Sequence, residues 1–386
     1  MKVAVTTLAS CVAALLALGM VMLYSPSSSM MQGTAQQVTR VGAHYLIMQM
    51  IWCTLGLVLC VTATAVDYRR LKQIVWPAFG IAVVLLVLVL LPLPHGITKS
   101  INGARRWFIF PGIRLQPSEF AKLVLILALA WYADRYQRTM LTWWRGIVLP
   151  GIIAASIIGL MFVEPDRGST ILMASVCGAM LLIAGVRWKY IVPPLVLGLI
   201  AFAFAIWRDP VRMRRVFSWM DLEGSKTGVG FQAYQAMLAL GSGGWTGLGL
   251  GNGRQKLGWV PEHHTDFIFS IIGEELGLIA TLLVVLAFVM IVICGIYISL
   301  RASDTFGFLL GCGLTFLIGL QAFINIGVVT SALPNKGLPL PFISYGGSNL
   351  LAMLTCIGLL FSIACQGRVT RRVENPFAGE ELPQPA

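Results

Sequence analysis

Long runs without a single Asp, Glu, Lys or Arg constrain this chain more than any other feature of its sequence. A helix needs about 20 consecutive, mostly apolar residues to cross the hydrocarbon core of a bilayer. Nine uncharged runs come close to this length or exceed it: 3–39, 41–66, 73–98, 146–163, 168–186, 190–207, 276–300, 305–335 and 337–367. The sequence therefore predicts an all-α, polytopic membrane protein.

A tenth span is expected at 116–133, although this stretch contains Glu119 and Lys122. The two residues are three apart, so on a helix they lie on one face and can pair, which lowers the cost of burying each charge. The span at 276–300 is expected to begin earlier in the chain, near Asp266. Ten transmembrane helices result.

The composition excludes most other classes of protein. Only 11% of the residues are charged and 57% are apolar, whereas a soluble domain carries about 25% charged residues. A soluble enzyme, a disordered chain and a nucleic-acid-binding protein are therefore excluded, although the net charge is +12. The eight cysteines all lie in apolar runs, which indicates small buried hydrophobes without disulfides or a zinc site.

The Lys and Arg residues of the short loops predict the orientation. With ten spans both termini lie on one side, and placing them in the cytoplasm puts 13 Lys and Arg inside against seven outside. Cytoplasmic loops carry the excess of positive charge, so this orientation is favoured. The run 3–23 exceeds the apolar core of a signal peptide, about 7–15 residues, and is expected to be retained as a helix.

The longest connection is predicted at 208–265, as one periplasmic loop between the seventh and eighth helices. The uncharged run 227–253 belongs to this loop because nine of its 27 residues are glycine, which makes a poor lipid-exposed helix. Residues 1–366 are then a single transmembrane domain. Residues 367–386 are polar and are expected to form a disordered cytoplasmic tail.

Basic residues cluster in the outer loops, where the topology does not require them. The clusters contain Arg105 and Arg106, then Arg212, Arg214 and Arg215, then Arg254 and Lys256. They indicate an anionic ligand at the outer face. Phosphate headgroups of the bilayer and a phosphorylated lipid substrate both fit this charge, and the charge alone leaves the two open.

The segment P-E-H-H-T-D-F-I-F at 261–269 contains the most informative carboxylates. Glu262 and Asp266 are four apart, so a helical turn places both on one side. Either Thr265 or Asp266 is the N-cap of the following helix, or Asp266 is a base that faces a headgroup at the membrane surface. His263 and His264 are adjacent, which is the wrong spacing for two metal ligands on one helical face.

Other carboxylates have a structural and a functional interpretation. In E-P-D-R-G-S at 164–169, Asp166 can cap the next helix. Glu274 and Glu275 lie about 12–13 Å into the helix that follows Asp266, at 1.5 Å per residue. At that depth they need Lys122 or another basic partner, or they serve as proton-relay groups of a transporter.

The stretch L-P-N-K-G-L-P-L-P-F-I-S-Y-G-G-S at 333–348 cannot form a regular helix, because it contains three prolines and three glycines. It is expected to be an ordered outer loop or a re-entrant segment, since such backbone is tolerated only against protein or a water-filled cavity. Lys336 places one cation in it.

Taken together, these motifs resemble the SEDS family (shape, elongation, division and sporulation), which includes FtsW, RodA and SpoVE. The resemblance also rests on G-A-R-R-W-F at 103–108, Q-P-S-E-F-A-K at 116–122 and G-L-G-L-G-N-G-R-Q-K-L at 247–257. Lys336 favours the cell-division branch, FtsW, over RodA. E-P-D-R-G departs from the Q-P-D-x-G that is common in relatives, at Glu164.

The resemblance implies a peptidoglycan glycosyltransferase of the bacterial inner membrane, located at the division septum. Its substrate is lipid II, a disaccharide-peptide on undecaprenyl pyrophosphate, and its catalytic aspartate is Asp266. Its partners are a class B penicillin-binding protein, which is a transpeptidase, and other divisome membrane proteins. Nucleic acid is not expected as a partner.

The residues agree with such a reaction. One carboxylate suffices as the general base for an inverting displacement, and cations stabilise the leaving pyrophosphate. Candidate substrate contacts are Arg105, Arg106, Arg212, Arg215, Arg254, Lys256, Glu262, Lys336 and Ser344. A divalent cation, Mg²⁺ or Mn²⁺, can share the task, but the sequence shows no ligand set for one. A lipid II flippase that uses Glu119, Lys122, Glu274 and Glu275, and a non-catalytic divisome scaffold, stay open as alternatives.

Overall fold

The computed structural model describes residues 1–27, 35–91, 98, 105–110, 113–221, 224, 226, 228, 230–256, 264–335 and 337–374. Their secondary structure is almost entirely helical. The helices are α1 (Lys2–Ser27), α2 (Ala35–Ala65), α3 (Leu71–Leu90), α4 (Pro117–Arg135), α5 (Leu149–Val163), α6 (Arg167–Ile183), α7 (Trp188–Trp207), α8 (Pro210–Met220), α9 (Phe231–Ser242), α10 (Ile268–Leu300), α11 (Thr305–Val329) and α12 (Gly347–Glu374). The only two strands in these ranges, β1 (Phe108–Phe110) and β2 (Ile113–Leu115), form an antiparallel hairpin.

The protein is a polytopic helical membrane protein. Seven helical segments of the described ranges are long and apolar enough to cross a bilayer; they lie in α1, α2, α3, α5, α10, α11 and α12. α6 and the first part of α7 are apolar but shorter. α4 coincides with the predicted span that contains Glu119 and Lys122. A helix therefore lies at each of the ten predicted spans.

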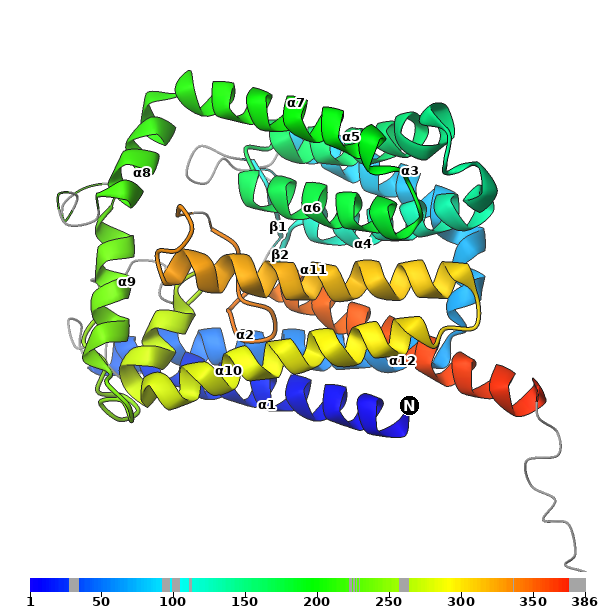
Figure 1. Ribbon diagram of the computed structural model, residues 1–386. Helices are drawn as coiled ribbons and strands as arrows, with labels where there is room; N and C mark the ends of the chain where they lie inside the picture. Colours follow the sequence, from blue (N-terminus) through cyan, green and yellow to red (C-terminus); the bar gives the residue numbers. More distant parts are fainter. Residues whose placement is uncertain are drawn as a thin grey trace, which may run out of the picture.

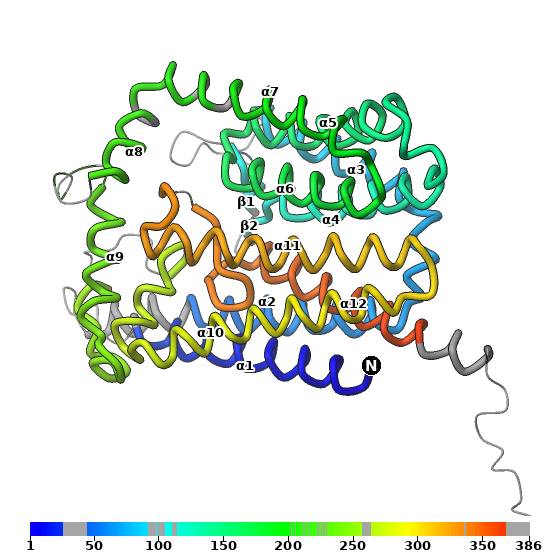
Figure 2. The backbone as a smooth tube through the Cα atoms, viewed as in Figure 1, coloured from blue at the N-terminus to red at the C-terminus, as the bar shows by residue number. Residues whose placement is uncertain are grey.

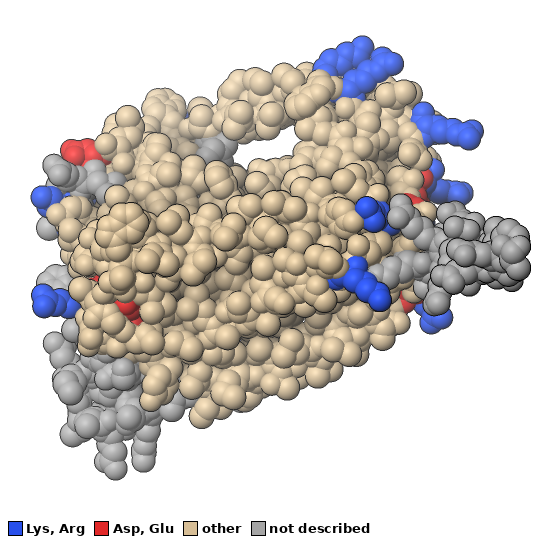
Figure 3. All heavy atoms as spheres, turned by 60° about the horizontal axis from the view of Figure 1, so that its bottom comes forward, with Lys and Arg blue, Asp and Glu red and all other residues tan. Residues whose placement is uncertain are grey.

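The long helices run side by side, and α11 lies between the group α1, α2, α10 and α12 and the group α3 to α6 (Figure 1). The N-terminus and the C-terminal end of α12 lie at one end of the bundle. The hairpin, α8 and α9 lie at the other end, and the tube in Figure 2 shows α8 and α9 joining α7 to α10 there. On the face drawn in Figure 3, charged side chains gather at the two ends and leave a broad uncharged band between them.

The core is centred on α4, α11 and α12, which are the most buried of the long helices. Small residues allow the close approach that membrane helices need, because hydrophobic burial does not drive them together in lipid. At Gly313 of α11, a Cβ atom would lie 2.7 Å from side-chain atoms of Ile126 on α4 and Met180 on α6. Glycine at this position lets α11 fit between α4 and α6.

A polar cluster fixes the end of the bundle that holds the N-terminus. Lys72 of α3 forms ion pairs with Asp134 at 2.8 Å and with Asp304 at 3.1 Å. Asp304 is also the N-cap of α11 and accepts a hydrogen bond from the buried Tyr68. The cluster therefore joins the starts of α3 and α11 to the end of α4.

Two parts of the chain differ from the prediction. The predicted loop at 208–265 contains two helices, α8 and α9. α9 can form within the glycine-rich run because only one of its own twelve residues is glycine. The helix α12 continues through Glu374, beyond the predicted boundary at residue 366. Residues 375–386 of the predicted tail lie outside the described residues.

Candidate active site

A cavity of about 680 Å³ opens among the ends of several helices, at the end of the bundle that holds the hairpin. Its walls come from the hairpin flanks, the turn between α5 and α6, the segment before α10 and the segment before α12. More than half of the residues that line it have polar side chains: Arg106, Gln116, Glu119, Asp166, Arg167, Ser169, Gln232, Thr265, Asp266, Asn335, Tyr345 and Asn349. The cavity is large enough for a sizeable polar substrate.

Asp266 lies in the cavity wall, directly before α10. The helix begins at Ile268, and its N-cap residue is Phe267, which makes no side-chain capping bond. The N-cap position of α10 is therefore Phe267, one residue after Asp266. A partly exposed carboxylate in a cavity can act as a base.

The backbone that carries Asp266 is held by donors from other elements. The Tyr345 N–H donates to the carbonyl of His264 at 2.9 Å. The Ser344 hydroxyl donates to the carbonyl of Thr265 at 2.6 Å, and the Asn325 amide donates to the carbonyl of Asp266 at 2.8 Å. Three consecutive carbonyls are therefore fixed. Ser344 was predicted as a substrate contact, but it is buried and supports the backbone instead.

Arg106 and Arg167 supply the positive charge of the cavity. Arg106 donates from Nε to the carbonyl of Glu164 at 3.1 Å and from Nη2 to the carbonyl of Pro165, and its Nη1 lies 4.0 Å from Asp166 Oδ1. The guanidinium of Arg167 stacks on Phe162, 3.9 Å from the ring centroid. Two arginines at one turn suit an anionic group.

Asp166 caps α6, as its position in E-P-D-R-G-S predicts. Its carboxylate accepts from the Ser169 N–H at 3.2 Å and from the Gln116 amide at 3.3 Å. These bonds connect the turn between α5 and α6 to the start of α4. Asp166 therefore supports the cavity wall.

Glu164 lies in the same turn, outside the helices, and is fully buried. Neither carboxyl oxygen has a hydrogen-bond partner among the described residues. Burial, and then the charge of Asp166, raise the pKa of Glu164 to about 8, while Arg106 lowers it. Glu164 is therefore mostly protonated at neutral pH, beside the arginine of the cavity.

The predicted pair of Glu119 and Lys122 is present. Lys122 Nζ lies 2.8 Å from both carboxylate oxygens of Glu119 and 3.3 Å from the Gln321 amide oxygen. Asn349 also donates to Glu119, at 2.9 Å. Glu119 and Asn349 both line the cavity, so this network forms part of its wall.

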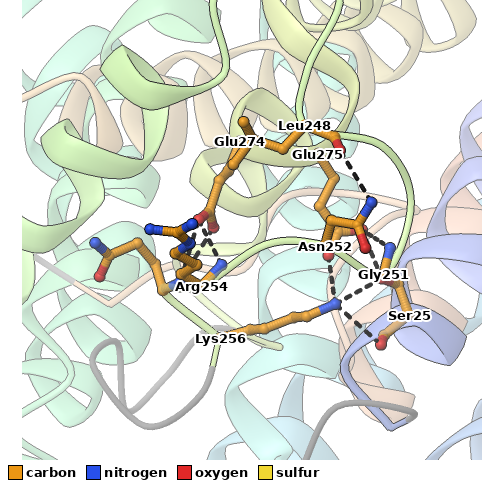
Figure 4. A network of polar contacts seen from close by, with 9 residues as sticks. Ser25, Leu248, Gly251, Asn252, Arg254, Lys256, Glu274 and Glu275 are labelled. Carbon is orange, nitrogen blue, oxygen red and sulfur yellow. Dashed lines mark hydrogen bonds and ion pairs between the residues drawn. The ribbon is translucent and has the colours of Figure 1, made fainter.

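Lys256 does not lie where it was predicted. Its side chain is fully buried, and Nζ lies 2.6 Å from Glu275 Oε1 and 3.2 Å from the Ser25 hydroxyl (Figure 4). Lys256, and not Lys122, is the partner of Glu275. Lys256 also donates to the Ser25 carbonyl at 3.3 Å, and a cation at the C-terminal end of α1 is favourable. It is therefore a structural cation that does not contact the cavity.

Glu274 is bound by the same loop. Its carboxylate accepts from the backbone N–H groups of Arg254 at 2.6 Å and Gln255 at 3.2 Å. The loop can reach this depth because α10 is interrupted at Gly277, where φ is 78°. At this interruption the Leu248 N–H donates to the carbonyl of Glu274 and the Gly249 N–H donates to the carbonyl of Glu275, both at 3.0 Å.

One family model matches residues 6–369: the FtsW, RodA and SpoVE family, described as cell cycle proteins. The chain belongs to this family. It is 40% identical to the probable peptidoglycan glycosyltransferase FtsW of Geobacter metallireducens, over 92% of this chain and 93% of that protein. It is 39% identical to the protein of the same name from Coxiella burnetii, over 92% of this chain and 94% of that protein. The predicted resemblance is confirmed, and the predicted enzyme class is the one these relatives carry in their names.

Solved structures of the family have the same fold. A chain in a structure described as "Structural coordination of polymerization and crosslinking by a peptidoglycan synthase complex" matches with a TM-score of 0.76 at 27% identity, over 93% of this chain and 97% of that chain. The rod shape determining protein RodA of Thermus thermophilus matches with a TM-score of 0.66 at 26% identity, over 93% and 96%.

The other predicted contacts of this family member fall into two groups. Arg105 and Arg254 are exposed and do not line the cavity. Glu262 and Lys336 lie outside the described residues, as do the side chains of Arg212 and Arg215 on α8. Gln116, Arg167 and Asn349 also line the cavity, although none of them was predicted as a contact. Gln116 and Arg167 stand in the motifs Q-P-S-E-F-A-K and E-P-D-R-G-S, which could have indicated them.

A dedicated metal centre does not fit the described residues. No group of three or more His, Cys, Asp or Glu side chains within them is placed to hold a metal ion. Asp166, the carboxylate nearest to the arginines, already accepts two hydrogen bonds. The divalent cation stays a prediction, and no chemical step is assigned to it.

Proposed function

We propose that this chain polymerises lipid II into glycan strands, with Asp266 as the general base. The observation that carries the proposal is that Asp266 lies in the wall of one cavity together with Arg106 and Arg167. A base and a pair of cations are the two requirements of glycosyl transfer from a lipid pyrophosphate. The relatives described above are named probable peptidoglycan glycosyltransferases, which supports this substrate class.

In the proposed reaction, Asp266 removes the proton from the acceptor sugar hydroxyl. The hydroxyl oxygen attacks the anomeric carbon of the donor, and the bond from that carbon to the pyrophosphate breaks with inversion. The leaving group takes the electron pair as lipid pyrophosphate. Arg106 and Arg167 offset the negative charge that develops on it.

The membrane topology that this function requires has ten spans, both termini in the cytoplasm and a periplasmic cavity. The pairing of Glu119 with Lys122 explains how α4 can span although it contains two buried charged residues. The N-terminus and the end of α12 lie at the end of the bundle opposite the hairpin (Figure 1). Residues beside the hairpin line the cavity, which supports an outer position for the cavity. The bacterial inner membrane at the septum is the proposed location.

A partner follows from the structural comparison. The matched synthase complex is described as coordinating polymerisation with crosslinking. We extend this to the present chain and propose a class B penicillin-binding protein as its transpeptidase partner, within the divisome.

The flippase alternative loses support, because its candidate groups have fixed partners. Glu275 pairs with Lys256, Glu274 accepts backbone N–H groups, and Glu119 pairs with Lys122. Groups that relay ions or headgroups need to exchange partners. The direct experiment incubates purified full-length protein with lipid II; a muramidase-sensitive polymer is expected, and its absence in the presence of the transpeptidase partner contradicts the proposal.

A further inference from the structure

Two buried amides on α11 face the cavity wall. Gln321 and Asn325 are four residues apart, which places them on one face of the helix, and their exposed fractions are 0% and 1%. Gln321 Nε2 donates to the carbonyl of Pro339 at 2.9 Å. Asn325 Nδ2 donates to two carbonyls, those of Asp266 at 2.8 Å and Leu338 at 2.6 Å.

The chemistry of this contact requires an amide nitrogen at residue 325. Both neighbours are carbonyl oxygens, so a carboxylate or the amide oxygen would face two acceptors, whereas an NH₂ group offers two donors. The Asn325 oxygen has no hydrogen-bond partner among the described residues. The role of this side chain is therefore carried by its two donors.

These donors join two backbone segments: the one that carries the proposed base, Asp266, and the one that contains Leu338. Asp266, Leu338 and Pro339 all line the cavity. Gly337, next to Leu338, lies against the Asp266 carboxylate. A shift of either segment relative to the other therefore moves the carboxylate relative to the cavity.

We propose that Asn325 is a positioning residue, which holds the Asp266 backbone against the segment 337–339 and thereby aims the Asp266 carboxylate into the cavity. The inference rests on the proposed function, in which Asp266 is the base. Gln321 donates to Pro339 and accepts from Lys122, but it makes no hydrogen bond to the Asp266 backbone, so it provides a comparison on the same helix face.

The test compares Asn325→Ala with Gln321→Ala in purified full-length protein. Initial rates of lipid II polymerisation are measured against lipid II concentration and normalised to the folded, monodisperse fraction. Asn325→Ala is expected to lower kcat about 10²-fold with KM unchanged, because a misplacement of about 1 Å costs that much. Gln321→Ala is expected to lower kcat far less. Asn325→Ser keeps one donor and is expected to lie between Asn325→Ala and the wild type.

Three results overturn the inference: Asn325→Ala leaves the normalised kcat unchanged, Gln321→Ala lowers kcat as much as Asn325→Ala does, or Asn325→Ala raises KM and leaves kcat unchanged. If Asn325→Ala yields no folded protein, Asn325→Ser takes its place, and wild-type kcat in that variant has the same meaning. Asp266→Asn is run beside them. If Asp266→Asn polymerises like the wild type, the proposed function fails and the inference with it; if it is inactive while Asn325→Ala is fully active, only the inference fails.

Discussion

Gly337 lies directly against the carboxylate of Asp266: a Cβ atom at residue 337 would come within 2.4 Å of Asp266 Oδ2. The atom that it meets is the end of a side chain, which can rotate away without any movement of the backbone. A methyl group here therefore displaces the carboxylate and leaves the fold in place.

Gly337→Ala is accordingly expected to lower the rate of polymerisation by about 10²-fold, the usual cost of misplacing a reacting group. Gly346→Ala is the matched control, since it adds a methyl group at another glycine of the same cavity whose nearest neighbour lies 3.8 Å away. Polymerisation rates and melting temperatures are measured for both. Equal rates in the two variants would show that the Gly337 contact does not matter for catalysis.

The buried carboxyl of Glu164 predicts a dependence of stability on pH. Its pKa is raised from 4.5 to about 8 in the folded protein. The protonated carboxyl therefore favours the folded state, fully below pH 4.5, and this stabilisation declines as the pH rises until it is lost above about pH 8. Each pH unit in that window costs about 1.4 kcal/mol. Glu164→Gln removes the ionisation and is expected to flatten the decline in melting temperature between about pH 5 and pH 8, the window between the unfolded and folded pKa values. Parallel curves for the variant and the wild type would contradict the prediction.

The ion pair of Lys256 and Glu275 predicts a large effect on stability. Both side chains are fully buried, and removing one partner of such a pair costs about 3–5 kcal/mol. Lys256→Met is expected to lower the melting temperature in detergent strongly, and the added change Glu275→Gln to restore part of it. Lys72→Met is the comparison, because the Lys72 ion pairs are partly exposed to solvent, so their loss is expected to cost less than that of the fully buried pair. Equal decreases in melting temperature in Lys256→Met and Lys72→Met would contradict this prediction.

The orientation predicts where reporters are found. A reporter fused after Arg138 or at the C-terminus is expected in the cytoplasm, and one inserted within 212–226 in the periplasm. Compartment-specific activity of the reporters checks this. Reversed signals would overturn both the charge argument and the outer position of the cavity.

Contacts within one helical turn could be predicted from the sequence. Glu119 and Lys122 pair because i and i+3 lie on one face of any helix, and Asp166 caps α6 because its spacing from Ser169 fits a helix start. The helix positions follow from the uncharged runs, since a bilayer sets their length. Local geometry determines each of these features.

Contacts across the fold could not be predicted in this way. Lys256 was assigned to the substrate because a basic residue near a basic cluster indicates an anion, whereas its partner is Glu275, on another element. The interruption of α10 at Gly277 brings them together, and no periodicity reveals it. Gln321 and Asn325 did carry a signal: two amides four residues apart in an apolar span are expected to face a polar partner.

The central claim is that Asp266 is the base, and Asp266→Asn tests it most directly. Asn keeps the shape of the side chain but cannot accept the proton, a loss typically worth about 10²–10⁴ in rate. With purified protein and lipid II, the variant is expected to remain folded and to form almost no polymer, while Asp209→Asn, outside the cavity, polymerises like the wild type. Polymer from Asp266→Asn at the wild-type rate would contradict the claim.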